Sequence, residues 1–233
     1  MKIALLGYGR MGKEIEKIAL QRGHEIVIKD NGSTDYDIKD ADVAIDFSIP
    51  TAAFGNITKC INNNIPVVSG TTGWLEKYQE VVDLCNEKEG AFIYASNFSL
   101  GVNLFFELNK QLAKMMNNLE DYATSIEEIH HTKKLDAPSG TAITLAEGII
   151  ENSDKNEWEL DGSPTNTSIP IKAVRTPEVP GTHTINYDSA IDSIEIKHTA
   201  HNRKGFALGA VVAAEWLVNK TGIYSMKDVL NIG

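Results

Sequence analysis

The sequence predicts an α/β fold in which a doubly wound parallel sheet is followed by a second domain of α+β type with a mixed or antiparallel sheet. Three observations support this prediction. Over roughly the first hundred residues, short apolar runs alternate with helical patterns, which is typical of parallel strands joined by right-handed helical crossovers. The alternation then stops, and three strand-like runs follow one another after residue 167. Near the end of the chain, an apolar helix at 206–218 can return to the first sheet.

The elements of the first sheet are marked by apolar runs and by helix start and stop signals. Met11, Ile15 and Ile18 recur at helical spacing, and Gly23 follows them as a stop signal. Pro50 marks the start of a second helix, because proline is well suited to the first helical turn. The expected strands are 2–7, 25–29, 43–47, 66–69 and 91–94, and the expected helices are 10–22, 51–61 and 74–88.

The second part of the chain has a different pattern. A long amphipathic helix is expected at 100–116, and alternation at 193–199 indicates a half-exposed antiparallel strand. The other expected elements are a strand at 122–129, a helix at 139–150, a polar stretch at 151–167, and strands at 168–174 and 182–187. We therefore expect one domain at 1–98, rejoined by 206–233, and a second domain at 99–205.

Composition excludes several classes of function. The 233 residues include 22 basic and 32 acidic side chains, and the net charge of −10 argues against binding to nucleic acid or to an anionic membrane. No apolar run reaches the roughly 18 residues that span a bilayer, and the first apolar run is too short for a signal peptide. Cys60 and Cys85 lack metal-ligand spacing. We expect a reduced, cytoplasmic, globular protein, in which the charge that holds an anionic ligand must be local.

A glycine-rich motif lies between the first expected strand and the first expected helix. Its first glycine allows a tight turn, its second lets the backbone approach a pyrophosphate, and its third permits close helix–strand packing. The helix N-terminus adds free N–H groups and partial positive charge. A turn that binds nothing is the alternative, but the position of the motif favours a dinucleotide site and makes 1–98 a Rossmann-type domain. The residues expected to contact the cofactor here are Gly7, Tyr8, Gly9, Arg10, Met11 and Gly12.

Asp30 ends the second strand, 18 residues after Gly12. A carboxylate at this spacing accepts hydrogen bonds from the adenosine ribose and repels the 2′-phosphate of NADP. Asn31 follows in place of the arginine that would bind this phosphate, although Lys29 could offset some of the negative charge. We therefore expect NADH as the preferred cofactor, with NADPH as the alternative.

Three further strand ends should lie at the same edge of the sheet, because ligands of doubly wound sheets bind outside the carboxyl ends of the strands. Small polar residues with accessible backbone suit a nicotinamide ribose and carboxamide. Ordinary turn chemistry is the alternative for these segments. The residues expected to contact the cofactor here are Phe47, Gly70, Thr71, Thr72, Ala95, Ser96, Asn97 and Phe98.

The densest cluster of chemically active residues is the segment 128–142, where two adjacent histidines precede two lysines. A metal site is disfavoured, because adjacent side chains on a strand point to opposite faces, no third ligand is evident, and lysines repel a cation. An anion site is favoured, since Lys134 and a histidine supply charge and the helix start at Ser139 offers free N–H groups to a carboxylate. A solvated basic loop is the remaining alternative.

This segment carries a long and specific pattern: Glu128-x-His130-His131-x-x-Lys134-x-Asp136-Ala137-Pro138-Ser139-Gly140-Thr141-Ala142. With this pattern the chain resembles the dihydrodipicolinate reductase family, whose members are also called 4-hydroxy-tetrahydrodipicolinate reductases. The resemblance extends over nearly the whole chain. It includes the segments 7–12, 46–48, 70–73, 97–103 and 198–203, and Gly209 with Ala210.

The resemblance implies the reduction of a cyclic imine dicarboxylate, 4-hydroxy-tetrahydrodipicolinate, to tetrahydrodipicolinate with NAD(P)H on the diaminopimelate route to lysine. It implies that His130 donates or accepts a proton and that Lys134 is a second proton donor. His131, Gly140 and Thr141 match contacts to the substrate carboxylates. It further implies a homotetramer whose second domain serves substrate binding and oligomerisation. A histidine and a lysine near positive charge are suitable acids for this chemistry.

Two features depart from the family pattern. Pro177 and Pro180 stiffen a loop that is usually rich in glycine, and the chain is short for the family. An NAD-dependent dehydrogenase acting on another small amino or keto acid is the alternative function, but the histidine–lysine spacing argues against it. A dinucleotide-sensing regulator is disfavoured by the net acidity and by the lack of a basic recognition helix.

Overall fold

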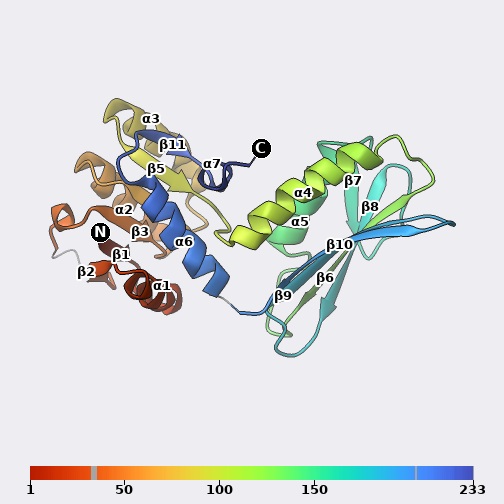
Figure 1. Cartoon of the computed structure of the whole chain (residues 1–233), viewed down its shortest axis with the longest axis horizontal. Coiled ribbons are helices and arrows are strands. Elements are labelled where there is room, and N and C mark those ends of the chain that lie inside the picture. Colours follow the sequence, from red (N-terminus) through yellow and green to blue (C-terminus); the bar gives the residue numbers. More distant parts are fainter. Residues whose placement is uncertain (33–35, 203, 233) are drawn as a thin grey trace. The chain divides into compact units, whose positions relative to one another are not determined.

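The computed structural model describes residues 1–32, 36–202 and 204–232. The chain folds into two compact units, one made of Met1–Asn103 with Lys204–Gly233 and the other of Leu104–Arg203. Figure 1 shows the helices and strands of each unit in sequence colours. No helix of these described ranges is both long and apolar enough to cross a membrane.

The first unit contains a parallel sheet with the strand order β11-β5-β4-β3-β1-β2. The chain passes from β2 at one edge to β3 on the other side of β1, so that the strand order reverses next to β1. Ligands of such sheets bind at this point of reversal. The strands are β1 (Lys2–Leu6), β2 (Glu25–Asp30), β3 (Val43–Asp46), β4 (Val67–Ser69), β5 (Ala91–Tyr94) and β11 (Gly222–Tyr224). The predicted doubly wound sheet is confirmed.

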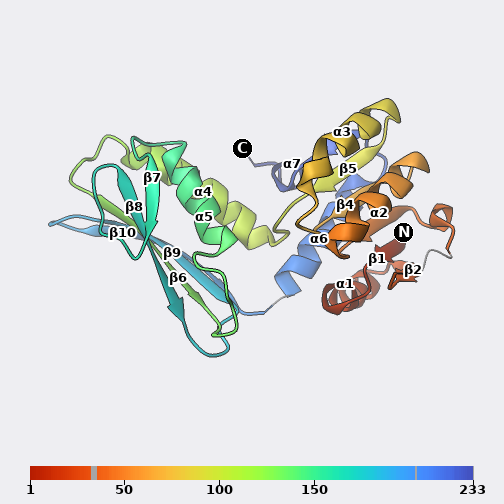
Figure 2. The same cartoon turned by 180° about the vertical axis from the view of Figure 1, so that it is seen from behind.

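Helices cover both faces of this sheet, because the side chains of each strand alternate between two apolar cores. Ile3 and Leu5 of β1 belong to the core under α1 and α6, whereas Ala4 and Leu6 belong to the core under α2 and α3. Figure 1 shows α1 and α6 in front of the sheet. Figure 2, which is the view from behind, shows α2 and α3 on the other face. The helices are α1 (Arg10–Gln21), α2 (Pro50–Asn62), α3 (Tyr78–Glu87), α6 (Lys204–Leu217) and α7 (Met226–Leu230), with 3₁₀ turns at Ile38–Asp40 and Leu75–Lys77.

Gly209 allows α6 to lie directly on the chain that follows β5. A Cβ atom at this buried position would stand 1.7 Å from the carbonyl oxygen of Phe98. We expect Gly209→Ala to lower the free energy of unfolding by about 2–3 kcal/mol, because a clash with backbone is not relieved by rotating a side chain. Urea unfolding of this variant and of Gly205→Ala measures the effect. Gly205 is a matched control in the same helix, since its Cβ would come no closer than 3.6 Å to Ser99, and equal stability of the two variants would contradict the prediction.

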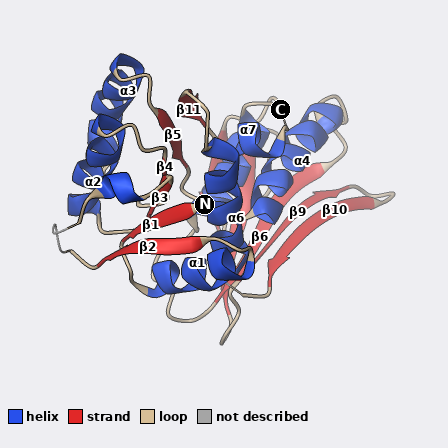
Figure 3. Cartoon of the chain, turned by 60° about the vertical axis from the view of Figure 1, so that its left-hand side comes forward, coloured by secondary structure: helices blue, strands red, loops and turns tan. Residues whose placement is uncertain are grey.

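The second unit contains a mixed sheet with the strand order β10-β9-β6-β8-β7. The central strand β6 pairs in parallel with β8 and antiparallel with β9, which confirms the predicted mixed sheet. The strands are β6 (Ala123–His130), β7 (Glu157–Leu160), β8 (Ser168–Arg175), β9 (Gly181–Asp188) and β10 (Ser193–Ala200), and the helices are α4 (Leu100–Met116) and α5 (Gly140–Ile150). Figure 3 distinguishes these strands, in red, from the helices, in blue.

One face of this second sheet packs against an apolar core and carries a cluster of polar groups at its end. The buried positions of β6 alternate along the strand, and Ile126 among them packs with Leu145 of α5. Because strand side chains at alternate positions share a face, Glu128 and His130 lie on this helix-covered face at the carboxyl end of β6. The opposite face of β6 carries Ser125 and Glu127, which line a depression together with Lys172, Thr184 and Asn186.

The structure differs from the expected elements in four places. The helix expected at 74–88 begins only at Tyr78, after the separate 3₁₀ turn Leu75–Lys77. Strand β7 lies within the stretch 151–167, which the sequence predicts as a polar connection, and only Trp158 of its four residues is partly buried. An edge strand with this little burial shows no alternation to detect. Strand β11 and helix α7 also lie outside the expected elements, because three and five residues are too few to show a period.

Candidate functional site

The loop between β1 and α1 has room only for glycine at two of its positions. Gly7 has a φ of +96°, and a Cβ atom on it would stand 2.2 Å from the carbonyl oxygen of Phe47. A Cβ atom on Gly12 would stand 2.4 Å from the carbonyl oxygen of Gly7. Gly9 is the N-cap of α1 and offers no side chain to its first N–H groups, while Arg10 is exposed at the first helical position. This cradle fits the pyrophosphate of a dinucleotide.

Asp30 lies beside this loop and braces it. Its carbonyl oxygen accepts the N–H groups of Gly7 at 3.0 Å and Tyr8 at 2.8 Å. Its Oδ1 accepts the N–H of Gly32 at 2.9 Å, and the residue is 8% exposed. The carboxylate therefore stands next to the pyrophosphate cradle, at the position expected for a ribose contact.

The ammonium group of Lys29 pairs with Glu16 and not with Asp30. Its Nζ lies 2.5 Å from Oε1 of Glu16, and the hydroxyl of Tyr8 donates to the other oxygen of the same carboxylate. The hydrogen bond from Lys29 is the main reason why the pKa of Glu16 lies below its ordinary value. Glu16 thus already neutralises the lysine that could have offset the charge of Asp30.

Asp46 joins the loops that follow β3 and β4. Its side chain is 0% exposed, and its oxygens accept four hydrogen bonds, from donors between 2.7 and 2.9 Å away. The donors are Ser48, Asn56, Ser69 and Thr71. The Thr71 hydroxyl also accepts the N–H of Ser48 at 2.9 Å. Thr71 is among the residues expected to contact the cofactor, whereas the sequence indicates no role for Asp46, because only the fold brings its partners together.

An aromatic pair lies at the same strand ends. The rings of Phe47 and Phe98 are 5.7 Å apart, and a Cβ atom on Gly70 would stand 2.3 Å from the Phe47 ring. Gly7, Phe47, Gly70 and Phe98 are therefore brought together as expected for one wall of a cofactor site. Asn97 instead supports its own loop, since its Oδ1 accepts the N–H of Ser99 at 2.9 Å. Thr72 and Ser96 are exposed, and Ala95 is partly buried.

In the second unit, Glu128 is the centre of a buried network. Both of its oxygens lie 3.1 Å from the backbone nitrogen of Ser139, which donates to them. Nη2 of Arg175 donates to Oε1 at 3.2 Å, and Nδ1 of His130 lies 3.1 Å from Oε2. Nε2 of His183 lies 3.8 Å from Oε2 and 3.1 Å from the hydroxyl of Ser139. The side chains of Glu128, His130 and His183 are at most 9% exposed.

Lys134 lies in the turn after β6. Its Nζ is 2.6 and 2.9 Å from the two carboxylate oxygens of Asp136, and its backbone N–H donates to the carbonyl of His131 at 3.0 Å. Hydrogen bonding from Lys134 is the main cause that lowers the pKa of Asp136. Nδ1 of His131 has no hydrogen-bond partner among the described residues. The Asp136 side chain is far more exposed than that of Lys134, 61% against 21%, so the ion pair is open to solvent on the side of Asp136.

The N-terminus of α5 follows directly. Ser139 is the N-cap, and its hydroxyl accepts the N–H of Ala142 at 3.2 Å. Gly140 is exposed, with no atom within 4 Å of where its Cβ would be, and Thr141 is partly buried beside it. An exposed first turn with partial positive charge suits a carboxylate group. The predicted substrate residues therefore lie on one continuous segment, from the end of β6 to the start of α5.

The three groups Glu128, His130 and His183 have ligand atoms within 4.8 Å of one another, a spacing that a metal ion could use. His183 is the third such group, and the sequence does not indicate it, because it comes from the distant strand β9. Both oxygens of Glu128 are already occupied by donors, and one of these donors is the Arg175 guanidinium. A cation would have to displace these donors beside a fixed positive charge, so the cluster suits a hydrogen-bonded carboxylate better than a metal ion.

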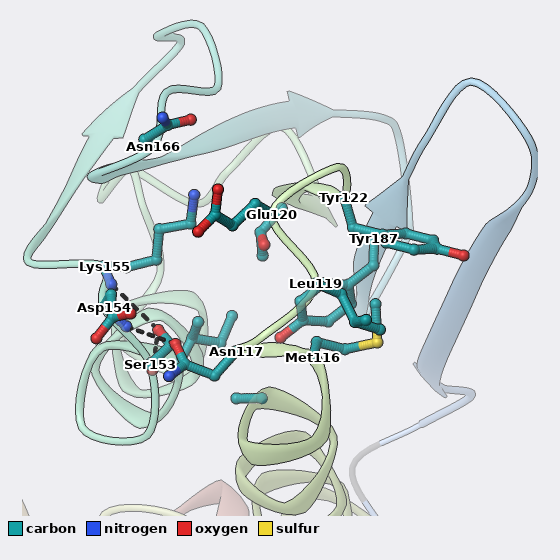
Figure 4. A pocket seen from close by; sticks show the side chains of 13 residues that line it. Met116, Asn117, Leu119, Glu120, Tyr122, Ser153, Asp154, Lys155, Asn166 and Tyr187 are labelled. Carbon is teal, nitrogen blue, oxygen red and sulfur yellow. Dashed lines mark hydrogen bonds between the residues drawn. The ribbon is translucent and has the colours of Figure 1, made fainter.

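A separate pocket of about 220 Å³ lies between the ends of α4 and α5 (Figure 4). Met116 and Ile149 provide part of its apolar lining, and Tyr187 of β9 also lines it. Lys155 donates to the carbonyl of Thr165 at 2.7 Å. The lining contains none of the residues of the two clusters above, so this pocket is not the candidate substrate site.

Comparisons with known proteins agree with this geometry. A family model described as "Dihydrodipicolinate reductase, N-terminus" matches residues 1–98, and one described as "Dihydrodipicolinate reductase, C-terminus" matches residues 101–230. The chain is 61% identical over 235 residues to the 4-hydroxy-tetrahydrodipicolinate reductase of Christiangramia forsetii, with 99% of this chain and 98% of that protein covered. It is 34% identical over 232 residues to the protein of the same name from Thermosipho africanus, with the same coverage.

Solved structures show the same fold. The dipicolinate-bound dihydrodipicolinate reductase from Paenisporosarcina sp. TG-14 has a TM-score of 0.76 at 24% identity, over 97% of both chains. An amine dehydrogenase from Mycobacterium smegmatis has a TM-score of 0.59 at 8% identity, over 97% of this chain and 95% of the other. At these identities the similarity concerns the arrangement of the elements.

Proposed function

Because the chain belongs to the dihydrodipicolinate reductase family, we propose that it reduces 4-hydroxy-tetrahydrodipicolinate to tetrahydrodipicolinate, on the diaminopimelate route to lysine. The chain is an oxidoreductase whose first unit has the fold that binds a nicotinamide dinucleotide. The observation that carries the choice of substrate is the segment after β6, where two histidines and Lys134 lead into the open N-terminus of α5. A cyclic imine with two carboxylates requires this combination of acids and anion-binding groups.

The two units have different roles in this proposal. The first unit, with Gly7, Asp30 and Phe47 at its strand ends, binds the dinucleotide, and the second unit binds the substrate. The boundaries of these roles follow the expected domains at 1–98 with 206–233 and at 99–205. When bound, the cofactor supplies a hydride to an electron-poor carbon of the substrate ring.

The residues after β6 supply the proton and hold the carboxylates. His130 and Lys134 are assigned as the groups that donate a proton as negative charge develops on the reduced ring. His131 and the first turn of α5, at Gly140 and Thr141, are assigned to the substrate carboxylates. The ion pair of Lys134 with the exposed Asp136 supports this assignment, because it keeps an ammonium group ready where a carboxylate can replace Asp136.

The preferred cofactor in this proposal is NADH. The support is the position of Asp30 beside the pyrophosphate cradle together with the pairing of Lys29 to Glu16, which leaves the carboxylate uncompensated by that lysine. NADPH, whose 2′-phosphate would meet the negative charge, is used less efficiently.

We expect Asp30→Asn to lower the ratio of kcat/KM for NADH to that for NADPH by about tenfold, since about 1.4 kcal/mol of charge repulsion corresponds to that factor. Steady-state kinetics with both cofactors measure the ratio. Glu25→Gln, at the exposed start of the same strand, is the control and should leave the ratio unchanged. A wild-type enzyme that prefers NADPH would refute the role of Asp30.

Further parts of the proposal concern assembly and location. We propose a homotetramer formed through the second unit, as the resemblance to the family implies. Light scattering on the purified chain tests this assembly. The two cysteines are buried free thiols, which suits the reducing conditions of the cytoplasm. The proposal involves no metal ion, nucleic acid or membrane.

The function is tested by mixing the protein with freshly generated 4-hydroxy-tetrahydrodipicolinate and following the oxidation of NADH and of NADPH. Substrate-dependent oxidation with formation of tetrahydrodipicolinate is expected. Oxidation with another amino or keto acid, but none with this substrate, would replace the proposal by the dehydrogenase alternative.

A further inference from the structure

Glu128 is surrounded by hydrogen-bond donors. Burial raises the pKa of its carboxyl, but the close contact with His130 and the hydrogen bonds from Ser139 and Arg175 outweigh burial and bring the pKa to about 2. The carboxylate is therefore ionised at neutral pH. A buried anion of this kind determines which atoms of the neighbouring groups are protonated, because a proton that faces the anion is stabilised.

The contact with His130 selects one form of the imidazole ring. Nδ1 lies 3.1 Å from Oε2 of Glu128, at ion-pair distance though without the alignment of a full hydrogen bond, and it has no other partner among the described residues. A neutral imidazole carries its single proton on one of its two nitrogens, and an adjacent carboxylate favours the proton on the nearer one.

We propose that Glu128 is a positioning residue, which keeps the neutral ring of His130 protonated at Nδ1, so that Nε2 is the atom that takes up a proton from solvent and, in the imidazolium paired with Glu128, donates it to the substrate. This inference rests on the function proposed above, because it names the atom of His130 that takes part in that reaction. It also explains why a glutamate precedes the histidine pair by two positions, since this spacing places Glu128 and His130 on the same face of β6.

The surroundings of Nε2 agree with this role. A Cβ atom on Gly181 would stand 3.0 Å from Nε2 of His130, so the glycine keeps that side of the ring uncrowded. The ring of His183 packs edge-on against His130 at 5.0 Å. Burial, and then the charge of His130, lowers the pKa of His183 to about 4, so His183 is neutral, and its Nε2 shares a hydrogen bond with the Ser139 hydroxyl.

Glu128 also reaches the second proposed acid. Arg175 donates to Glu128 and, through the same Nη2, to the carbonyl oxygen of Asp136 at 2.7 Å, while its Nε lies 3.4 Å from the carbonyl oxygen of Lys134. The carboxylate thus fixes the guanidinium that holds the turn carrying Lys134. One buried anion positions both groups that we assign to proton transfer.

Glu128→Gln is the variant that tests this role. The amide must turn its NH₂ group toward one of the donors around it, and among these His130 can respond by moving its proton from Nδ1 to Nε2. We expect the neutral His130 ring to change from the Nδ1–H to the Nε2–H form, and kcat to fall about 10- to 100-fold. The KM for NADH should stay within about twofold, because the cofactor residues belong to the other unit.

Two measurements report these effects separately. Long-range ¹H–¹⁵N spectra of ¹⁵N-histidine-labelled protein distinguish the two ring forms, and the signals of His130 are assigned by their loss in His130→Gln. Steady-state kinetics supply kcat and KM. Glu127→Gln is the matched control, since Glu127 is the adjacent glutamate on the opposite face of β6, paired with Lys172, and its replacement should change neither readout.

The outcomes separate this inference from the proposed function. A wild-type enzyme that reduces the substrate, combined with an unchanged ring form and kcat in Glu128→Gln, overturns the positioning role alone. A wild-type enzyme without that activity overturns the proposed function, while the ring forms still report on Glu128. If Glu128→Gln does not fold, the wild-type spectrum decides, because an Nε2–H form of His130 in the wild type contradicts the inference without any variant.

Discussion

Lys134→Ala is expected to lower kcat for the reduction of 4-hydroxy-tetrahydrodipicolinate by about 1000-fold, because a positioned general acid contributes about 100- to 10,000-fold. The ammonium group is also expected to bind a carboxylate in place of Asp136, so the KM for the substrate should rise. The KM for NADH should stay within about twofold, since Lys134 lies outside the unit that carries the dinucleotide cradle. Steady-state kinetics with saturating NADH measure all three parameters.

Lys133→Ala is the matched control for this experiment. Lys133 is the neighbouring lysine on the same turn, with the same charge but an exposed side chain. If both variants lose activity equally, the effect is one of local charge and the role of Lys134 in proton transfer is wrong. The double variant with His130→Ala adds a second test. If both groups act in one proton transfer, removing both costs less transition-state stabilisation than the sum of the two single losses.

The parts of the site that follow from local chemistry could be predicted from the sequence. The loop after β1 is recognisable because three glycines stand at fixed spacing between a strand and a helix. The N-terminus of α5 is recognisable because a proline and a serine precede the helix. In both cases the residues that make the feature are neighbours in the sequence, and their chemistry specifies the backbone between them.

The networks behind these features depend on contacts that the fold creates. The partners of Glu128 come from β8 and β9 as well as from the segment after β6, and neither Arg175 nor His183 can be paired with it by spacing alone. The same holds for the pairing of Lys29 with Glu16, which joins β2 to α1. The histidines and lysines at 130–134 indicate from the sequence that an anion can be bound, whereas the partner of each charged group depends on the register of the strands.

Asp46→Asn is expected to lower the free energy of unfolding by about 3 kcal/mol, because hydrogen bonds to a buried charged group are worth about 1.5–3 kcal/mol each. Oδ1 accepts from Ser48 and Asn56, and Oδ2 accepts from Ser69 and Thr71. An amide replaces one of these oxygens by an NH₂ donor. Thr71 cannot fully adapt to this donor, since its oxygen already accepts the N–H of Ser48.

Thermal unfolding measures this loss, and a fall in Tm of about 6–12 °C is expected for a chain of this size. Asp42→Asn is the control, because Asp42 is an exposed aspartate just before the same strand that accepts a single backbone N–H, from Lys2. The KM for NADH should rise in the Asp46 variant, since the loops after β3 and β4 lose the carboxylate that joins them beside the cofactor cradle. A stable Asp46→Asn protein with an unchanged KM would show that the two loops keep their places without the charge, and Asp46 would then have no role in forming the cofactor site.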